Sequence, residues 1–476
     1  MPPNLSNPAN LSTLTRVLVL TVAAVGFLFD TYELLMFPVI GRDALAELLK
    51  VPGTDPAVRL WTGRLLWIAA LCGGVFGLLG GWLIDRLGRK TIMVASILAY
   101  SLSPVAAAFS TELWHLILFR CTTFVGVCVE MVAAVTWLAE LFADKRTREK
   151  AIAWSLAAAS LGGILVTEVF IFIKGIAADL PALPVPDGSN GHAAWRYTLL
   201  TGLIPGALIL ALLPFVPESQ VWKRKKLEGT LKRPSFRELF APALLKTTLV
   251  TTVLSACGYA AAFGALQLTP PQIVQGVPEV SAKAAEFDAK IKEAKPADKK
   301  EIIEAKAKAM QGYTGEIQRW QEIGGLTGRI LLALLVLVIP SRWLIRGFLI
   351  PGIVLFPLTY LEVVKMDYAL FAASIFFCGL LTVAQFSFLS EFLPKVFPMH
   401  LRGTGGSFAT NVGGRMIGTM AATLNTELLS KMFAEVYENP TPFDVAKAAA
   451  LIGGVVYLVA FGATFLLPKP AEPEAS

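Results

Sequence analysis

Charged residues are scarce in this sequence. Asp, Glu, Lys and Arg make up 16% of the 476 residues, whereas hydrophobic residues make up 55%. Soluble globular proteins carry roughly one quarter charged residues, and the core of a soluble domain cannot enclose this much apolar surface. The composition therefore excludes an ordinary soluble protein and predicts that most of the chain lies in lipid.

Cysteine and histidine are also few, with five and three residues. The cysteines all fall in apolar segments, at spacings that match no metal or redox motif, so we expect no disulfides. The histidines are far apart, and none has a second candidate ligand beside it. The sequence therefore indicates neither a metal site nor the nucleophile–base pair of an enzyme.

The apolar residues occur in twelve runs, most of them near the length of about 20 residues that crosses a bilayer as a helix. The runs cover residues 14–40, 60–84, 91–109, 113–142, 151–176, 195–216, 243–268, 323–340, 346–362, 368–392, 404–429 and 445–467. We therefore predict an all-α membrane protein with twelve transmembrane helices in two six-helix, pseudo-symmetric bundles. Residues 1–13 lack the basic leader of a signal peptide, so we expect the first run to stay in the mature protein.

Two polar segments interrupt these runs. The basic segment 217–242 separates two sets of six runs. This predicts an N-terminal bundle over residues 1–216, a cytoplasmic linker over 217–242, a C-terminal bundle over 243–467 and a tail over 468–476. The second polar segment, residues 269–322, is a long outer insert in the C-terminal bundle.

The insert contains two stretches rich in Ala, Glu and Lys, residues 281–295 and 297–311, separated by a proline. Their helix propensity and their opposite charges four residues apart favour a helical hairpin over a solvated linker. Asp298 and Glu301 resemble a capping box, and Gly312 suits a helix end. Such a hairpin would offer a surface for a periplasmic partner.

Lys and Arg are unevenly distributed among the short loops. If both termini lie inside, the short inner segments hold most of these cations, as the positive-inside rule requires. The insert does not count, because long translocated segments do not follow that rule. We therefore predict cytoplasmic termini, and the net charge of +7 becomes an orientation signal with no implication of nucleic-acid binding. The sequons at Asn4 and Asn10 then lie inside, which favours a bacterial inner membrane.

A ten-residue motif lies between the second and third runs, GWLIDRLGRK from Gly81 to Lys90. It resembles the signature loop G-x-L-x-D-R-x-G-R-K that the major facilitator superfamily carries at the same place. The resemblance implies a monomeric transporter that works by alternating access, with this loop closing the cytoplasmic side while the carrier faces outward. The gate residues so assigned are Gly81, Asp85, Arg86, Gly88, Arg89 and Lys90.

A second resemblance covers residues 397–405, FPMHLRGTG. It is similar to a motif of the sugar-porter and metabolite:proton-symporter branches of that family. Those branches carry an acid shortly before the motif, where this chain has Lys395, with Glu391 one turn earlier. The first half has a counterpart in an acid followed by two arginines. We add to the predicted gate Glu140, Arg146, Arg148 and Arg402.

Glycines recur every four residues in two of the runs, as Gly73, Gly77 and Gly81 in the second and as Gly414 and Gly418 in the eleventh. This spacing allows close helix contact in lipid. Two interpretations stay open. The family resemblance implies that these two helices meet across the bundle interface, but the same glycines would also serve packing inside each bundle.

Ionisable residues inside the runs are the candidates for function. Each costs roughly 3 kcal/mol at the bilayer centre, so it tends to line a cavity or form a pair. Asp30 and Glu33 share a face of the first run, and counting residues from the outer ends places Arg120 of the fourth run near the depth of Asp30. Related proton-linked carriers have an acid and an arginine at these positions. We predict proton coupling through Asp30, Glu33 and Arg120; the alternative is a static salt bridge.

Further polar residues are predicted for the substrate cavity. Arginines in such a cavity suit a carboxylate, and the seventh run lacks the paired glutamines of sugar porters. We therefore favour transport of a small organic acid or acidic sugar by proton symport, with the proton gradient as energy source and no cofactor. The alternatives are a neutral sugar or polyol porter, a uniporter, or a non-transporting nutrient sensor with the same fold. The predicted cavity residues are Tyr32, Glu130, Glu168, Tyr259, Gln385, Asn411 and Arg415.

Overall fold

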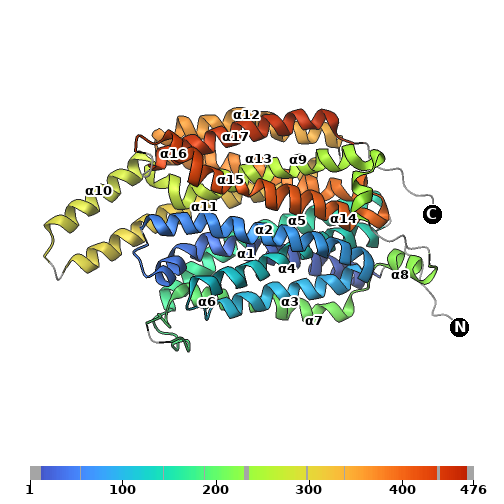
Figure 1. The fold of residues 1–476 in the computed structure, drawn as a ribbon, viewed down its shortest axis with the longest axis horizontal. Coiled ribbons are helices and arrows are strands. Elements are labelled where there is room, and N and C mark those ends of the chain that lie inside the picture. Colours follow the sequence, from blue (N-terminus) through green and yellow to red (C-terminus); the bar gives the residue numbers. More distant parts are fainter. Residues whose placement is uncertain are drawn as a thin grey trace.

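The computed structural model describes residues 12–53, 55–142, 144–186, 188–229, 235–295, 298–336, 338–436 and 440–468. Within these ranges every regular element is a helix and none is a strand. Most of the long helices run along the long axis of the molecule (Figure 1). The expected all-α class is confirmed.

The first five predicted spans are each one long helix, and the sixth is broken. The break falls at Gly202, where a Cβ atom would lie 2.5 Å from Oε1 of Glu33. The turn therefore makes room for a buried acid. The helices of this half are α1 (Thr13–Leu49), α2 (Pro56–Leu87), α3 (Arg89–Ala107), α4 (Leu113–Leu141), α5 (Lys145–Ile176), α6 (Ala194–Leu200) and α7 (Leu203–Leu212).

In the second half the eleventh predicted span is the irregular one, because it contains two π-helical segments. Such wide turns occur frequently at functional sites. Among the residues that the structure describes, nine helices are long and apolar enough to cross a membrane. The sixth, eighth and eleventh predicted spans do not each form a single helix of that length and apolar character. The elements are α9 (Pro242–Gly264), α11 (Lys299–Leu335), α12 (Ser341–Leu361), α13 (Tyr368–Val396), α14 (Arg402–Ser407), η8 (Phe408–Gly418), α15 (Met420–Thr423), η9 (Leu424–Leu429), α16 (Ser430–Phe433) and α17 (Pro442–Ala463).

The two halves have separate hydrophobic cores. The largest clusters of the first half lie between Val19 and Val216, and that of the second half lies between Leu239 and Leu467. The halves meet along two seams, α2 against α14 and η8, and α5 against α11. Helix α8 (Gln220–Leu227) marks one end of the molecule, here called the α8 end, and α10 (Pro278–Glu293) projects from the other, the hairpin end (Figure 1).

The insert forms the predicted helical hairpin, from α10 and the first part of α11. Lys306 of α11 pairs with Asp288 of α10 at 2.6 Å, which joins the two arms. On the exposed face of α10, hydrogen bonds from Lys283 and Lys290 lower the pKa of the Glu286 carboxyl group to about 2. The hairpin is thus stabilised by charge pairs on a solvated surface.

Helix α11 does not end at Gly312, as the sequence suggested. It runs for 37 residues from the hairpin into the bundle, and Asp298 makes no side-chain hydrogen bond at its start. One glycine costs only about 1 kcal/mol in a helix interior, and the Ala, Glu and Lys around it favour the helix. The second arm of the hairpin and the eighth span are therefore parts of one continuous helix.

Farther along α11, glycines allow close packing on α13. A Cβ atom on Gly324 would lie 2.0 Å from the main-chain oxygen of Phe376, and one on Gly328 would lie 2.2 Å from that of Leu380. Backbone atoms cannot move aside as a flexible side chain can. Small residues four apart therefore set the distance between these helices.

We predict opposite effects of alanine at two glycines of α11. Gly328→Ala should destabilise the protein by about 1–3 kcal/mol, because the methyl group overpacks the contact with α13. Gly312→Ala, with no atom near its Cβ position, should stabilise the helix by up to about 1 kcal/mol. Thermal unfolding of the detergent-purified variants measures both effects, and equal shifts in the midpoint would contradict the packing described.

Candidate functional site

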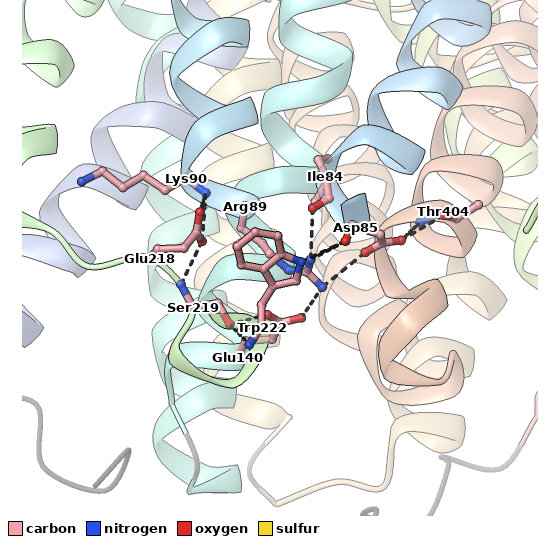
Figure 2. A network of polar contacts seen from close by, with 9 residues as sticks. All are labelled: Ile84, Asp85, Arg89, Lys90, Glu140, Glu218, Ser219, Trp222 and Thr404. Atoms are coloured by element: carbon pink, nitrogen blue, oxygen red, sulfur yellow. Dashed lines mark hydrogen bonds and ion pairs between the residues drawn. The ribbon is translucent and has the colours of Figure 1, made fainter. Parts of the chain in front are cut away.

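The first polar network lies at the α8 end, where α2 ends and α14 begins (Figure 2). Oδ2 of Asp85 accepts hydrogen bonds from the main-chain N–H and the hydroxyl group of Thr404, both at 2.9 Å. The N–H groups in the first turn of a helix have no partner within the helix, and a carboxylate satisfies them well. Asp85, only 2% exposed, thereby ties the first half to the second.

Arg89 holds two carboxylates together in this network. Its Nη2 lies 3.3 Å from Oδ1 of Asp85 and 2.8 Å from Oε1 of Glu140. Its Nη1 donates to the main-chain oxygen of Ile84 at 3.0 Å. Glu140 in turn accepts a hydrogen bond from the hydroxyl group of Ser219 at 2.5 Å. Buried charges persist only when they are paired and hydrogen-bonded, and this arrangement meets that condition.

The segment before and within α8 closes over the same network. The Glu218 carboxylate accepts the main-chain N–H of Lys90 at 3.1 and 3.0 Å, at the start of α3. The indole of Trp222 donates to the main-chain oxygen of Asp85 at 2.9 Å. Between α2 and α3, Gly88 has a φ of 109°, and a Cβ atom there would lie 2.7 Å from Glu218. Glycine is therefore required at this turn.

Other predicted gate residues lie outside this network. The Arg86 guanidinium group lies over the ring of Trp82, 4.9 Å from its centroid. Glu140, in contrast, belongs to the network, because it pairs with Arg89. Arg148 is partly exposed, and the side chain of Arg146 lies outside the described residues.

The second half has a simpler arrangement at the same end. Lys395 pairs with Glu391, one turn before it on α13. Lys395, which stands where the related branches carry an acid, thus pairs with an acid on its own helix. Arg402 begins α14 and borders a small cavity between the halves, together with Met131 and Thr410.

The glycine pattern serves both of the interpretations left open. Of the predicted glycines of α2, Gly77 and Gly81 face the second half: Cβ atoms there would lie 2.6 Å from Nδ2 of Asn411 and 2.4 Å from Cβ of Ser407. Gly73 instead packs on Cys128 and Phe124 within the first half. Gly414 and Gly418 pack on Tyr259 of α9 within the second half. Two of the three predicted glycines of α2 therefore lie at the bundle interface, whereas Gly73 and those of η8 serve packing inside each half.

A cavity of about 100 Å³ lies between the halves, midway along the molecule. Its lining is mainly apolar and aromatic. Tyr259 contacts Phe263 and Phe386, with ring centroids 6.0 and 4.8 Å apart. Four ionisable residues line it, two acids and two arginines: Asp30, Glu322, Arg329 and Arg415.

Asp30 and Glu130 form a carboxyl pair at this cavity. Oε1 of Glu130 lies 2.6 Å from where a Cβ atom on Gly26 would be, one turn before Asp30 on α1. The two carboxyl groups are within hydrogen-bonding reach of each other. Arg415 lies near them; its Nη1 donates to Oδ1 of Asn411 at 2.6 Å, and its Nε has no partner. Two carboxyl groups this close share a proton more readily than both ionise.

The predicted pairing of Asp30 with Arg120 is wrong. Arg120 donates to the main-chain oxygens of Glu33 and Leu34, at 2.7 and 2.8 Å, and does not line the cavity. Glu33 and Leu34 follow Asp30 by three and four residues on α1, so Arg120 lies about one helical turn from Asp30 along the helix, close to the depth that the count suggested. The count did not show which groups the guanidinium group would bind.

Of the residues predicted for the cavity, Tyr259 and Arg415 line it and Glu168 does not. Glu168 is largely exposed and pairs with Arg319 at 2.7 Å, so its assignment to the cavity is wrong. The sequence does not show that Glu168 lies on an exposed side of α5 near the hairpin end and not on the side that faces the cavity.

The remaining predicted residues lie behind the lining. Tyr32 shares a hydrogen bond with Thr201 at 2.5 Å, inside the first half. Gln385 donates to the main-chain oxygen of Leu381 at 3.2 Å, and Asn411 holds Arg415.

Two charged residues of the cavity were missed, Glu322 and Arg329 of α11. Arg329 donates to the main-chain oxygen of Leu156 on α5, across the seam between the halves. Glu322 accepts a hydrogen bond from Gln318 at 2.9 Å. Arg329 lies inside the predicted run 323–340. The expectation that ionisable residues inside a span line a cavity or form a pair therefore applies to it as well.

The hairpin end is closed by contacts of a different kind. Arg64 pairs with Glu427 at 3.2 Å, and Arg319 pairs with Glu168, and each of these pairs joins one half to the other. Their side chains are between 29% and 47% exposed. Exposed pairs contribute only about 0–1 kcal/mol each, far less than a buried, hydrogen-bonded network.

Comparison with known families agrees with this geometry. Residues 18–287, more than half of the chain, match the Major Facilitator Superfamily, and the chain belongs to this family. It is an integral, multi-pass membrane protein, and the family fold confirms the predicted twelve helices in two bundles. The relatives found are transporters, in agreement with the expectation that the chain is not an enzyme.

Curated relatives are similar over different lengths. The sialic acid transporter NanX of Escherichia coli is 25% identical over 50% of this chain, and the chain spans about half (52%) of that relative's length. The probable 4-methylmuconolactone transporter of Cupriavidus pinatubonensis is 24% identical over 86% of this chain and 84% of its own length. The 4-hydroxybenzoate transporter PcaK of Pseudomonas aeruginosa is 35% identical over 37% of this chain and 35% of its own.

Solved structures share the fold. The proton:xylose symporter XylE with bound 6-bromo-6-deoxy-D-glucose superposes with a TM-score of 0.66, at 17% identity, over 94% of this chain and 95% of that chain. A partially occluded, inward-open form of XylE from Escherichia coli gives a TM-score of 0.62, at 17% identity, over 94% and 97%.

We predict that Asp85→Asn loosens the α8 end. Loss of a charged hydrogen bond removes about 1.5–3 kcal/mol, so the native, buried Cys128 behind α2 should react with N-ethylmaleimide roughly tenfold faster or more. Arg86→Gln is the matched control in the same loop, and it should leave the rate unchanged. Peptide mass spectrometry measures labelling at this cysteine; equal rates in both variants would refute the role of Asp85.

Proposed function

We propose that this protein is a secondary transporter that moves a small organic anion through the central cavity by alternating access, coupled to proton symport. The observation that carries the proposal is the cavity itself. It lies between two bundles, and a carboxyl pair, Asp30 and Glu130, adjoins an arginine, Arg415, on the opposing half. A proton site and an anion site that lie side by side in one cavity provide the elements of symport.

The preference for an anion rests on charge and shape. Arg415 and Arg329 both line the cavity, and the Nε atom of each has no partner. A guanidinium group binds carboxylates through two parallel hydrogen bonds. The names of several relatives, the sialic acid, niacin and 4-hydroxybenzoate transporters, support an organic acid. The lining is mainly apolar, which does not favour a neutral sugar.

The proton site in this proposal differs from the one expected from the sequence. Asp30 remains the central residue, with Glu130 as its partner and Arg415 as the neighbouring cation. When a substrate anion engages Arg415, that cation stabilises the Asp30 carboxylate less, and proton binding there becomes more favourable. The coupling thus follows from competition between two anions for one guanidinium group.

We also propose that the α8 end faces the cytoplasm of a bacterial inner membrane and that the protein acts as a monomer. The basic residues of the signature loop and of α8 support this orientation by the positive-inside rule. The hairpin would then project into the periplasm, where it would be available to a partner.

Two alternative functions differ from symport in what they predict. A sensor of the same fold would bind its ligand without net transport of it, and a uniporter would transport its substrate without a pH gradient.

Asp30→Asn is predicted to separate exchange from accumulation. The amide resembles the protonated acid, so counterflow of substrate should persist while uptake driven by a pH gradient is lost. Purified protein in liposomes would be tested with labelled sialic acid, niacin and 4-hydroxybenzoate, and with xylose as the neutral comparison. Equal loss of counterflow and accumulation would contradict the coupling role, and uptake of xylose alone would contradict the anion.

Arg415→Gln is predicted to weaken anion binding. Losing a charged hydrogen bond costs about 1.5–3 kcal/mol, which corresponds to a roughly 10- to 150-fold higher KM for the transported anion. Arg120→Gln is the control, since this buried arginine bonds only main-chain oxygens away from the cavity. It should lower thermal stability and leave KM nearly unchanged. Similar KM values for the two variants would argue against Arg415 as the anion ligand.

A further inference from the structure

The cavity between the bundles has polar groups at two levels along the molecule. On α11, Gln321 and Arg329 both line it. This helix runs from the hairpin toward the α8 end (Figure 1), and at 1.5 Å per residue Arg329 lies about 12 Å nearer the α8 end than Gln321. One wall of the cavity thus offers an amide on the hairpin side and a cation on the α8 side.

Helix α9 and η8 give the same order of groups. Arg415 lies at the level of Tyr259, because a Cβ atom on the neighbouring Gly414 would lie 2.6 Å from Cδ2 of that ring. Gln267 lies in η3 (Leu266–Leu268), eight residues beyond Tyr259 in the direction of the hairpin. The two arginines that line the cavity therefore lie toward the α8 end, and the two glutamines that line it lie toward the hairpin end.

Both of these glutamines have an unpaired oxygen. Gln321 is 3% exposed and Gln267 is 9% exposed, and Oε1 of each has no hydrogen-bond partner. The orientation of the Gln321 amide has a cause, since its Nε2 donates to Oε1 of Glu322 at 3.4 Å and an ionised carboxylate can only accept hydrogen bonds. A buried carbonyl oxygen without a partner is unfavourable, so the two oxygens call for a donor in the cavity.

Glu322 itself is held in the seam between the halves. Its Oε1 also accepts a hydrogen bond from Gln318 at 2.9 Å, and a Cβ atom on Gly163 of α5 would lie 2.5 Å from its Oε2. Seven residues after Glu322, Arg329 donates to the main-chain oxygen of Leu156, which is seven residues before Gly163. Helices α5 and α11 therefore lie antiparallel in one register, which places the glutamine level as firmly as the arginine level.

An apolar, aromatic stretch separates the two levels. Phe263 lies one turn after Tyr259 and one turn before Gln267 on the chain, and the rings of Tyr259 and Phe263 stack with centroids 6.0 Å apart. The body of a ligand that reaches from the arginines to the glutamines would therefore be apolar. A carboxylate at the glutamine level would be repelled by Glu322, so the charged end of an anion belongs at the arginines.

We propose that the transported anion carries a neutral hydrogen-bond donor, a hydroxyl or N–H group, at the end of an apolar body opposite its carboxylate. Oε1 of Gln321 and Oε1 of Gln267 accept from this group. The inference rests on the proposed function, in which Arg415 binds the carboxylate, and it narrows the substrate to hydroxy- or N–H-substituted organic anions. An anion without the donor displaces water from the two amide oxygens and leaves them unpaired, so the site discriminates against it.

Binding measurements with size-matched pairs of anions test this proposal. 4-Hydroxybenzoate and 4-methylbenzoate form a flat pair, and 6-hydroxyhexanoate and heptanoate form a flexible pair. Within each pair a hydroxyl group in one anion replaces a methyl group in the other. Isothermal titration calorimetry of the detergent-purified protein gives each Kd. The wild-type protein should bind the hydroxylated member of at least one pair roughly tenfold more tightly.

Gln321→Met tests the recognition of the donor. It removes the amide oxygen at similar volume, so the ratio of the two Kd values should fall, and in the double variant with Gln267→Met it should fall to near 1. Gln318→Met is the matched control, because Gln318 bonds the same carboxylate but does not line the cavity, and it should keep the wild-type ratio. Arg415→Gln should weaken both members of a pair alike. Because each ratio is taken within one protein, a partly unfolded sample does not alter it.

Two results would overturn the inference and leave the proposed transport of an anion intact. One is equal Kd values for the two members of each pair in the wild-type protein, which would mean that water satisfies the amide oxygens. The other is the same ratio in Gln321→Met as in Gln318→Met. Failure of all four anions to bind would instead contradict the anion site itself, and this inference with it.

Discussion

The hydrogen bonds from Thr404 to the Asp85 carboxylate are the interaction on which the closed arrangement depends. Lipid offers no partner for a charge or for a free N–H group, so such groups must satisfy one another inside the protein. Asp85 belongs to one bundle and the first turn of α14 to the other. Arg89, Glu140 and the segment before α8 hold this carboxylate in place. Separation of the two bundles at the α8 end therefore breaks both hydrogen bonds from Thr404 to Asp85.

Within the part of the chain that the structure describes, the hairpin end has no equivalent buried network between the bundles. Its cross-bundle ion pairs, Arg64 with Glu427 and Arg319 with Glu168, are partly exposed and contribute about 0–1 kcal/mol each. The difference between the two ends implies that the closed form opens more readily at the hairpin end. Helix α11 connects that end to the cavity without interruption, from the hairpin through Arg319 to Glu322 and Arg329. Binding in the cavity and separation at the hairpin end thus involve the same helix.

Much of this fold follows from the sequence because lipid imposes a simple pattern. Apolar runs predicted all twelve spans, and the loop from Gly81 to Lys90 predicted where the polar network between the bundles lies, since its order of acid, glycine and cations is rarely matched by chance. Helix ends were harder to predict. Apolar runs mark where a helix crosses lipid and not where it ends, so the extension of α1 to Leu49 was not predicted.

Which face a residue occupies was harder still. Glu168 and Glu130 look alike in the sequence, yet one is solvated and the other faces Gly26. That distinction depends on how the helices rotate against one another, which a single sequence does not specify. Arg329 differs from these two, because it lies inside an apolar run and the rule of intramembrane charge that selected the other ionisable residues applies to it as well.

The central claim is that the two bundles move as bodies that open at one end at a time. Spin labels at exposed positions test it: Leu87 with Trp343 at the α8 end, and Glu112 with Met432 at the hairpin end. Double electron–electron resonance in liposomes would measure both distances across a range of pH. The account predicts a longer-distance population at one pair of labels, accompanied by the short distance at the other. Simultaneous lengthening at both ends, or fixed distances at both, would contradict it.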